Sequence, residues 1–217
     1  MDSPKPPDAP PRSKRAYDAE RTRRAILDAA RASFAEKGFS GANVSEIVAR
    51  AATTKPMIYY HFGSKEGLFA AVLEEVYAAM REIESTLDLA AVPPEAGLRR
   101  LVEATFDYHA AHPDWMRLIA IANIHDAQHI AGSPTIAAHN MPVIAILADL
   151  LERGRTAGVF RRQVDPLHLH LLIASMSFHR VSNRHSWRVI FERDLSADAE
   201  VQRTMLADAV LAYVASA

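Results

Sequence analysis

The segment 43–65 constrains the fold of this 217-residue chain more than any other part of it. Asn43 suits the first position of a helix, because its side chain can accept a hydrogen bond from an otherwise unpaired backbone amide. Glu46, three residues later, has the spacing of a capping-box partner. Residues 52–54 form a turn, whose last threonine can cap a second helix that begins at Lys55. The segment therefore predicts two short helices joined by a tight turn.

Basic and aromatic residues crowd the second of these helices. Apolar residues at Ile47 and Ile58 have spacings that lock the two helices against a preceding one. This packing leaves a face with Lys55, Met57, Tyr60 and His61 outward. The alternative is that Tyr59 and Tyr60 are core aromatics, but two tyrosines and a histidine in a row are hard to bury together on so short a helix. A short basic helix braced by another is what contact with a DNA major groove requires.

The rest of the chain reads as helices as well. Ile26, Ala29, Ala30 and Phe34 form one apolar stripe, and Gly38 ends that helix. Ser64 caps a long helix that runs to about Leu89, and its buried side is predicted to comprise Leu68, Val72, Val76, Met80 and Ile83. Further helices are predicted at 94–111, 113–131, 134–156, 165–184 and 198–216. The predicted fold class is all-α.

Composition narrows the function classes. The chain has no cysteine, which excludes disulfides and thiol catalysis and is compatible with a cytoplasmic location. No apolar run approaches the ~18 residues of a membrane span, and the first residues lack the apolar region of a secretory signal. The net charge is only −1, yet residues 1–70 hold 12 Lys/Arg against 8 Asp/Glu, whereas residues 71–217 hold 13 against 18. Positive charge thus gathers where the two short helices lie.

We expect three parts along the chain: a disordered arm at 1–16, a three-helix unit at 17–66, and a larger helical unit at 67–217. The arm is rich in proline and charge. It serves either as a solubilising tail, which we favour, or as a basic arm whose Arg12, Lys14 and Arg15 touch phosphates.

Three linked motifs resemble the TetR family of regulators: Arg23-x-x-Ile26-Leu-x-Ala-Ala30, Phe34-x-x-Lys-Gly-Phe39 and Tyr59-Tyr-His-Phe-x-Ser-Lys-Glu-x-Leu68. The resemblance implies a dimer that binds a double-stranded DNA operator through a helix-turn-helix and senses a small molecule with its larger domain. Weaker likenesses in the second half, such as His112-Pro-Asp-Trp-Met-Arg-Leu-Ile119 and Asp165-Pro166, resemble the subgroup that includes the pyrimidine-utilisation repressor.

The resemblance also implies roles for single residues. Tyr59 matches a tyrosine that packs on the DNA backbone. His61 and Lys65 match phosphate contacts, and Val44 and Ser45 fall where the first short helix meets the backbone. Positions that face bases are matched by Lys55, Pro56, Met57 and Tyr60. This chain departs from the pattern at Ala52, where glycine is common, and at Val44, which lacks a hydroxyl.

The larger unit holds nine of the ten histidines. His125 and His129, four residues apart on a helix, could bind a metal, but no further ligand stands at a fixed spacing, so we expect none. We expect instead a cavity for a small, partly polar organic effector. Its predicted lining combines apolar faces with hydrogen-bonding groups and draws on Phe106, His109, Trp115, Met116, Asn123, His125, Phe178 and His179. The alternative is that each of these is an ordinary packing residue.

Apolar stripes lie on the helices at 165–184 and 198–216 and would form an exposed patch on an isolated protomer. The resemblance to the TetR family implies that these helices form a homodimer interface. The alternative is that they fill the protomer core.

We therefore expect a repressor that an effector releases from a palindromic operator, with no catalytic residues and no cofactor. An activator is the close alternative. A helical small-molecule-binding protein or enzyme is the distant one, and it would leave the basic, aromatic segment 55–65 without a purpose.

Overall fold

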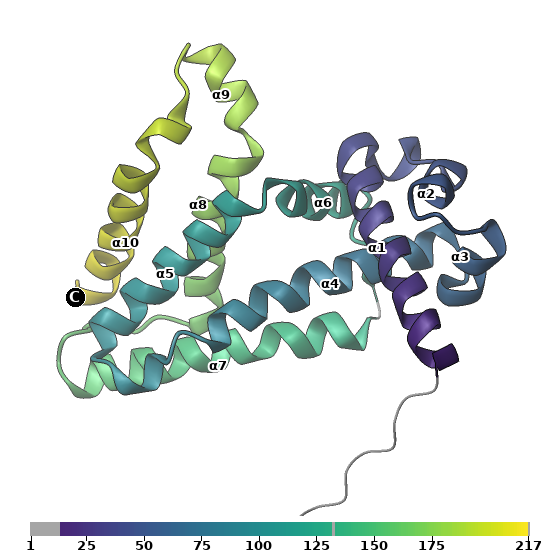
Figure 1. Cartoon of the computed structure of the whole chain (residues 1–217). Coiled ribbons are helices and arrows are strands. Elements are labelled where there is room, and N and C mark those ends of the chain that lie inside the picture. The colour runs from purple at the N-terminus through teal and green to yellow at the C-terminus, as the bar shows by residue number, and fades with distance from the viewer. Residues whose placement is uncertain (1–13, 132, 217) are drawn as a thin grey trace, which may run out of the picture. The chain divides into compact units, whose positions relative to one another are not determined.

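The structure, a computed structural model, describes residues 14–131 and 133–216, and this part of the chain contains helices and no strand (Figure 1). The helices form two compact units, with the boundary between Phe69 and Ala70. A small N-terminal helical unit followed by a larger one confirms the predicted fold class.

The first unit comprises α1 (Lys14–Gly41), α2 (Val44–Arg50), α3 (Lys55–Phe62) and the beginning of α4 (Lys65–Ser85). Of the predicted arm, residues 1–13 lie outside the described residues. Residues 14–16 belong to α1 instead, so the first helix starts earlier than expected.

Aromatic and aliphatic side chains fill the core of this unit. Ile26, Ala30 and Phe34 are buried, as the stripe predicted. The ring of Phe34 meets that of Phe69 edge-on, with 4.9 Å between centroids. Gly38 interrupts α1 with a φ of 74°, a left-handed conformation that glycine adopts without steric cost. This confirms Gly38 as the end of the first long helix.

The second unit contains the rest of α4 and then, in chain order, η1 (Leu89–Ala91), α5 (Pro94–Ala111), α6 (Pro113–Ile124), α7 (Pro134–Thr156), α8 (Pro166–Ser182), α9 (Arg184–Ile190), η2 (Leu195–Asp198) and α10 (Ala199–Ala215). The bounds of α5 and α7 are the predicted ones. The helix predicted over 113–131 ends at Ile124, and α9 was not predicted.

Helix α5 is central to this unit and packs against α7, α8 and α10 (Figure 1). Leu101, Leu147, Ile173 and Val210, one from each of these helices, are buried in their shared core. By length and composition α7 could also cross a membrane, but such a helix is equally typical of a folded core. Its Leu147 face is part of that core.

The buried face of α4 differs from the predicted one. Val72 and Val76 are buried as expected, but Ile83 is exposed. Arg81 and Glu84 are buried in its place. The apolar pattern assumed that charged side chains face solvent, and that assumption fails in the last turns of α4.

Candidate nucleic-acid interface and sensor site

Helix α3 presents two tyrosines to solvent. Ile58 is fully buried and fixes the inner side of the helix. Tyr59 is 51% exposed and Tyr60 is 78% exposed. Lys55 is also exposed, and it forms no ion pair within the part of the chain that the structure describes. The arrangement leaves an amphipathic surface of the kind that contacts nucleic acid.

The remaining residues of the predicted interface flank these three. Pro56 is exposed in the first turn of α3, and Met57 is half-buried beside it. On α2, Ser45 is exposed and Val44 is half-buried. The Asn43 side chain accepts a hydrogen bond of 2.8 Å from the Ser45 amide, which confirms Asn43 as the cap.

Two capping details differ from the prediction. The carboxylate of Glu46 pairs with Lys37 at 2.5 Å, so it serves the surface between α1 and α2 and not a capping box. Thr54 precedes α3 with an extended backbone, but its side chain makes no capping hydrogen bond.

The turn between α2 and α3 holds Ala52 at a φ of 48°. This left-handed conformation is costly for any residue with a Cβ atom. It explains why glycine suits this position, and it shows that alanine adopts the same tight turn.

His61 and Lys65 are more restrained than free surface side chains. The Nε2 atom of His61 is buried without a hydrogen-bond partner among the described residues, and the ring lies 5.0 Å from that of Tyr60. The Nζ atom of Lys65 lies 4.9 Å from the centre of the Phe39 ring, a cation–π contact. Lys65 begins α4, and Ser64 caps that helix as predicted, with its Oγ accepting from the Gly67 amide at 3.0 Å.

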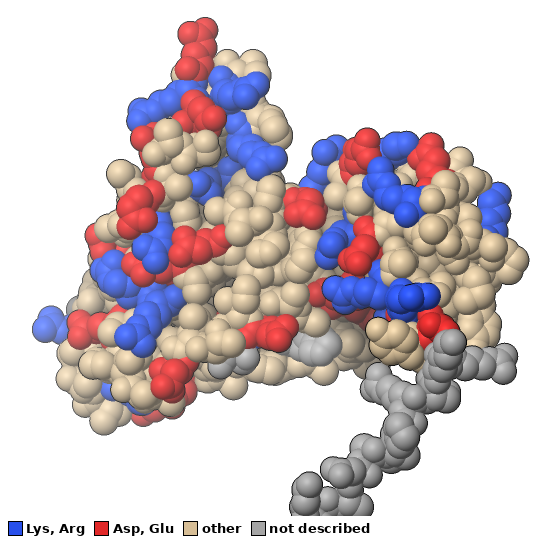
Figure 2. Space-filling view, in the orientation of Figure 1, with Lys and Arg blue, Asp and Glu red and all other residues tan. Residues whose placement is uncertain are grey.

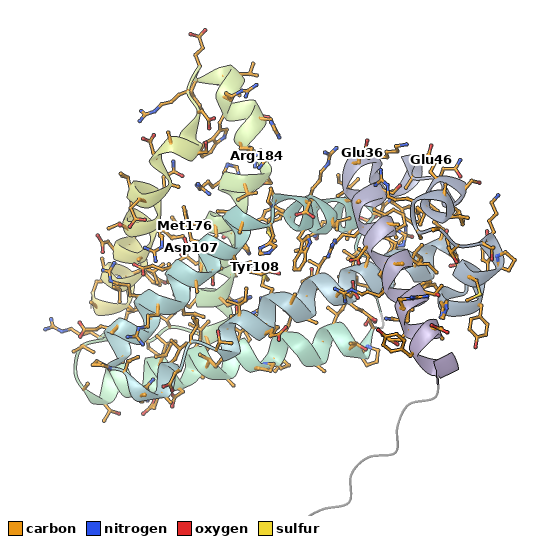
Figure 3. The ribbon with its side chains drawn as sticks, viewed as in Figure 1. Glu36, Glu46, Asp107, Tyr108, Met176 and Arg184 are labelled. Carbon is orange, nitrogen blue, oxygen red and sulfur yellow. The ribbon has the colours of Figure 1, made fainter. Side chains whose placement is uncertain are left out.

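Other cations near α2 are already neutralised. Arg50 pairs with Glu36 at 3.6 Å, and Lys37 pairs with Glu46. Figure 3 labels both carboxylates on this unit, and Figure 2 shows its basic and acidic side chains interleaved. The unpaired Lys55 is therefore the cation of α3 that is most available to a phosphate.

The eight residues predicted to line an effector cavity occupy three places in the second unit. His109 is buried inside it, and Trp115 and Met116 pack with Tyr108. Asn123 and His125 lie at the end of α6, where the Asn123 side chain is exposed. Phe106, Phe178 and His179 border a groove between α8, α9 and α10. Phe178 also packs against the cluster that contains Tyr108 and Met116, so it lies next to Trp115 and Met116 as well as beside the groove.

A set of buried polar side chains on α4, α5 and α8 was largely missed from the sequence. We call it the buried polar cluster, and it consists of the buried Arg81, Glu84, Tyr108, His109 and Ser177 together with the half-buried Tyr77 and His170. One signal for it was present: Arg81 continues the i, i+4 row of Leu73 and Tyr77, and Glu84 follows it at i+3 on the same side of the helix. Charged residues on the same face of a helix as a buried leucine can be expected to be buried as well.

Burial sets the charges of this cluster. It raises the pKa of Glu84 to about 7, although Arg81 opposes the shift. Burial, with the charge of Arg81 next, lowers the pKa of His170 to about 4. The pKa of His109 falls to about 4 through burial, Arg81 and His170, against weak opposition from the Ser177 backbone. Both histidines are therefore neutral at pH 7.

The groove between α8, α9 and α10 has a volume of about 790 Å³. Met176 and Met205 face it from opposite helices, and Figure 3 labels Met176 there. Leu167 and Leu171 of α8 and Val201 of α10 continue an exposed apolar surface on the same helices. Such a surface is unusually apolar for a free protomer.

Among the described residues, no three histidine, aspartate or glutamate side chains come together as a metal site. The rings of His125 and His129 lie 5.6 Å apart without a third ligand.

Known proteins match both units. Residues 26–72 match the bacterial regulatory proteins of the tetR family, and residues 94–210 match the tetracyclin repressor-like C-terminal domain. The second match alone spans more than half of the chain. The chain belongs to the TetR family.

Relatives agree with this assignment over nearly the whole length. The transcriptional repressor NicS of Pseudomonas putida is 37% identical over 182 residues, which are 84% of this chain and 86% of NicS. The structure named as the regulator SCO4942 of Streptomyces coelicolor aligns with a TM-score of 0.64 at 28% identity and covers 87% of this chain and 96% of that one. A tetR-family protein of Rhodococcus RHA1 shares the fold, with a TM-score of 0.70 at 22% identity over 95% of this chain and all of its own.

The protein is therefore a DNA-binding, ligand-responsive transcriptional regulator and not an enzyme. Regulators of the TetR family bind DNA operators and small-molecule effectors, typically as dimers.

Proposed function

We propose that this TetR-family protein is a cytoplasmic repressor that binds a palindromic operator as a homodimer and leaves it when a small organic effector binds. The observation that carries the DNA-binding part is the outward face of α3, where Lys55, Tyr59 and Tyr60 are exposed together. Two tyrosines at the surface of an eight-residue helix bury little apolar area in the free protein. They gain contacts when the helix enters a major groove.

Within this proposal the residues divide by task. Lys55, Pro56, Met57 and Tyr60 face the bases, whereas Tyr59 packs against the DNA backbone. Phosphates are contacted by Val44 and Ser45 at the beginning of α2, and by His61 and Lys65. The α2 amides can serve where Val44 lacks a hydroxyl, because backbone N–H groups at a helix start also bind phosphate. His61 would contact the phosphate through Nδ1, because its Nε2 is buried.

The homodimer forms through α8 and α10. Leu167 and Leu171 on α8, with Val201 and Met205 on α10, are large apolar side chains that the protomer leaves exposed. A second copy of the same surface covers them by two-fold symmetry. The two α3 helices must then lie about 34–36 Å apart, one turn of DNA, to enter successive major grooves.

The sign of regulation follows the relative NicS, which is named a repressor and resembles this chain over most of its length. The likeness of the second unit to the pyrimidine-utilisation repressor subgroup is a further proposal, and it names no effector. The alternative is an activator: a relative from Mycolicibacterium smegmatis, 34% identical over 99 residues, is named a transcriptional activator.

The test is binding to the DNA upstream of the protein's own gene at several salt concentrations. Several phosphate contacts, doubled by symmetry, predict a loss of ~10³-fold or more in affinity between 50 and 200 mM salt. Affinity that stays flat over this range contradicts an electrostatic DNA interface. Transcription of a reporter from the same DNA separates the two signs, because deletion of a repressor raises expression and deletion of an activator lowers it.

A further inference from the structure

The buried polar cluster has hydrogen-bonding groups without partners on three helices. Arg81 on α4 is 8% exposed, His109 on α5 is 2% exposed and Ser177 on α8 is 1% exposed. The Nε of Arg81 and the Oγ of Ser177 have no hydrogen-bond partner among the described residues, and the ring nitrogens of His109 have none beyond a weak contact with the Ser177 backbone. Protein interiors pair nearly all of their buried polar atoms, so such a group of orphans points to something that completes them.

The charge of Arg81 reaches the other members of the cluster. Its Nη1 donates to both oxygens of Glu84, at 2.8 and 2.7 Å. Even so, the charge of Arg81 lowers the pKa of both His109 and His170. The positive charge of Arg81 is therefore felt at the two histidines even though Glu84 accepts two of its hydrogen bonds.

We propose that the effector of this regulator is a small organic monoanion, and that Arg81, His109 and Ser177 bind its charged group. This inference rests on the proposed ligand-responsive function and deepens it. Arg81 offers a charged donor, His109 in its neutral form offers one donor and one acceptor, and Ser177 offers a hydroxyl. A carboxylate accepts hydrogen bonds from all three, and an Arg–carboxylate pair is among the strongest of these interactions.

An apolar wall lies beside these groups. Tyr108 packs with Met116, and the rings of Tyr108 and Trp115 are 5.7 Å apart in an edge-on contact. Figure 3 labels Tyr108 on α5, one residue before His109. The wall, which also includes Phe178, suits an apolar body attached to the charged group.

The same residues select against other charges. A cationic ligand would meet the positive field of Arg81. A second negative charge would lack a partner, since Arg81 is the one cationic side chain of the cluster. Glu84 lets a monoanion enter at little electrostatic cost, because its carboxyl group can take up a proton when the new anion replaces it beside Arg81.

The first experiment compares three benzene derivatives of similar size and different charge: benzoate, benzamide and benzylamine. Each is added at up to tens of millimolar to the full-length protein, and the unfolding midpoint is measured at pH 6.5. We expect benzoate to raise the midpoint by several degrees, benzamide to raise it less, and benzylamine to leave it unchanged. Equal stabilisation by benzylamine, or none by benzoate, overturns the proposal.

Substitutions test whether benzoate stabilises the protein by binding at Arg81. Arg81→Met combined with Glu84→Gln removes both buried charges at once, so that no unpaired ion remains to prevent folding. We expect it to fold and to lose the benzoate response. The matched control is Arg99→Met, which removes an exposed arginine that pairs with Asp208 and should keep the full response. A benzoate response that survives in the double variant overturns the assignment to Arg81.

The proposed function and this inference fail differently. If the protein does not bind its promoter DNA, the proposed function fails whatever the probes do. If the protein binds DNA and the double variant also binds it, but benzoate neither stabilises the protein nor weakens the DNA complex, this inference alone fails. Ordered water then completes the cluster.

Discussion

Tyr60 is the most exposed aromatic side chain of α3, whereas Lys65 is partly held against Phe39. This contrast predicts different outcomes for the two alanine variants. Tyr60→Ala should cost ~1–3 kcal/mol of binding to the operator and little on random DNA, because its position faces bases. Lys65→Ala should weaken binding to all sequences alike and reduce the salt dependence, because a phosphate contact carries no base information.

The measurement is fluorescence anisotropy with operator and scrambled duplexes at several salt concentrations. Tyr59→Phe, which keeps the ring, serves as the control for a contact with the DNA backbone. If both alanine variants lose specific and non-specific affinity in the same ratio, the assignment of the base-facing side of α3 is wrong.

The positive φ angle of Ala52 predicts that replacing this residue with glycine stabilises the protein. The left-handed φ of 48° costs an alanine ~1–2 kcal/mol, and glycine avoids that cost while it loses up to ~1 kcal/mol through a more flexible unfolded chain. Ala52→Gly should therefore stabilise the first unit by up to about 1 kcal/mol. Chemical denaturation monitors it, with Ala49→Gly inside α2 as a destabilising control. A loss of stability at both positions would show that the turn is not strained.

Near the C-terminal end of α7, Gly154 lies directly against the ring of Phe160. A Cβ atom built on Gly154 would lie 1.9 Å from a ring carbon of Phe160, which is itself buried. Glycine to alanine inside a helix normally gains ~1 kcal/mol, but forced overpacking costs ~1–3 kcal/mol. Gly154→Ala should thus destabilise the protein, and Phe160→Leu in the same chain should reduce the added loss. Unfolding midpoints of the two single variants and the double variant test this.

Helix α8 carries the dimer prediction. Leu171 is exposed, so Leu171→Glu should leave the protomer folded. In the proposed interface it would bury one unpaired charge per copy, two per dimer, at ~3 kcal/mol or more each, and weaken dimerisation by ~10⁴-fold or more. Sedimentation velocity over a range of concentrations measures this, with the exposed Ala138→Glu on α7 as the matched control. Unchanged dimerisation of the Leu171 variant would place the interface elsewhere.

At the scale of the whole molecule, the buried polar cluster links folding to pH. His109 and His170 bind their protons less tightly when folded, so between about pH 4 and 6.5 the unfolded chain holds more protons and stability rises with pH. Glu84, with its pKa raised to about 7, has the opposite effect: its carboxyl is protonated more readily in the folded chain, and stability falls as pH rises toward 7. Below pH 6.5 the effect of the two histidines on stability is larger than the opposite effect of Glu84. Above pH 6.5 only Glu84 changes the stability.

Stability should therefore peak near pH 6.5 and fall by up to ~3 kcal/mol toward pH 4.5, the effect of one net proton over two pH units. Urea unfolding between pH 4.5 and 8 measures the profile. Glu84→Gln should remove the decline above pH 6.5 and keep the rise below it. If this variant shows the same decline of stability above pH 6.5, Glu84 is not its cause.

The sequence alone determined the first unit almost completely. Its signals are local: Asn43 caps α2, Ser64 caps α4, Gly38 ends a helix, and the stripe through Ile26 and Phe34 repeats at helical spacing. Each depends on residues a few positions apart, and helix geometry fixes how such residues lie. The bounds of α5 and α7 followed from prolines in the same way.

Only the tertiary structure decided how the second unit uses its polar residues. The sequence placed Ile83 inside and gave no role to Arg81, Glu84, His170 or Ser177. The structure reverses this because the surroundings of Arg81 include His109 of α5 and His170 of α8, which lie far from it along the chain. The same holds for the predicted cavity residues: helix packing decided that Phe106, Phe178 and His179 border one groove and that His109 is buried. Whether a charge is buried depends on what covers it, and local periodicity carries no information about the helix that provides the cover.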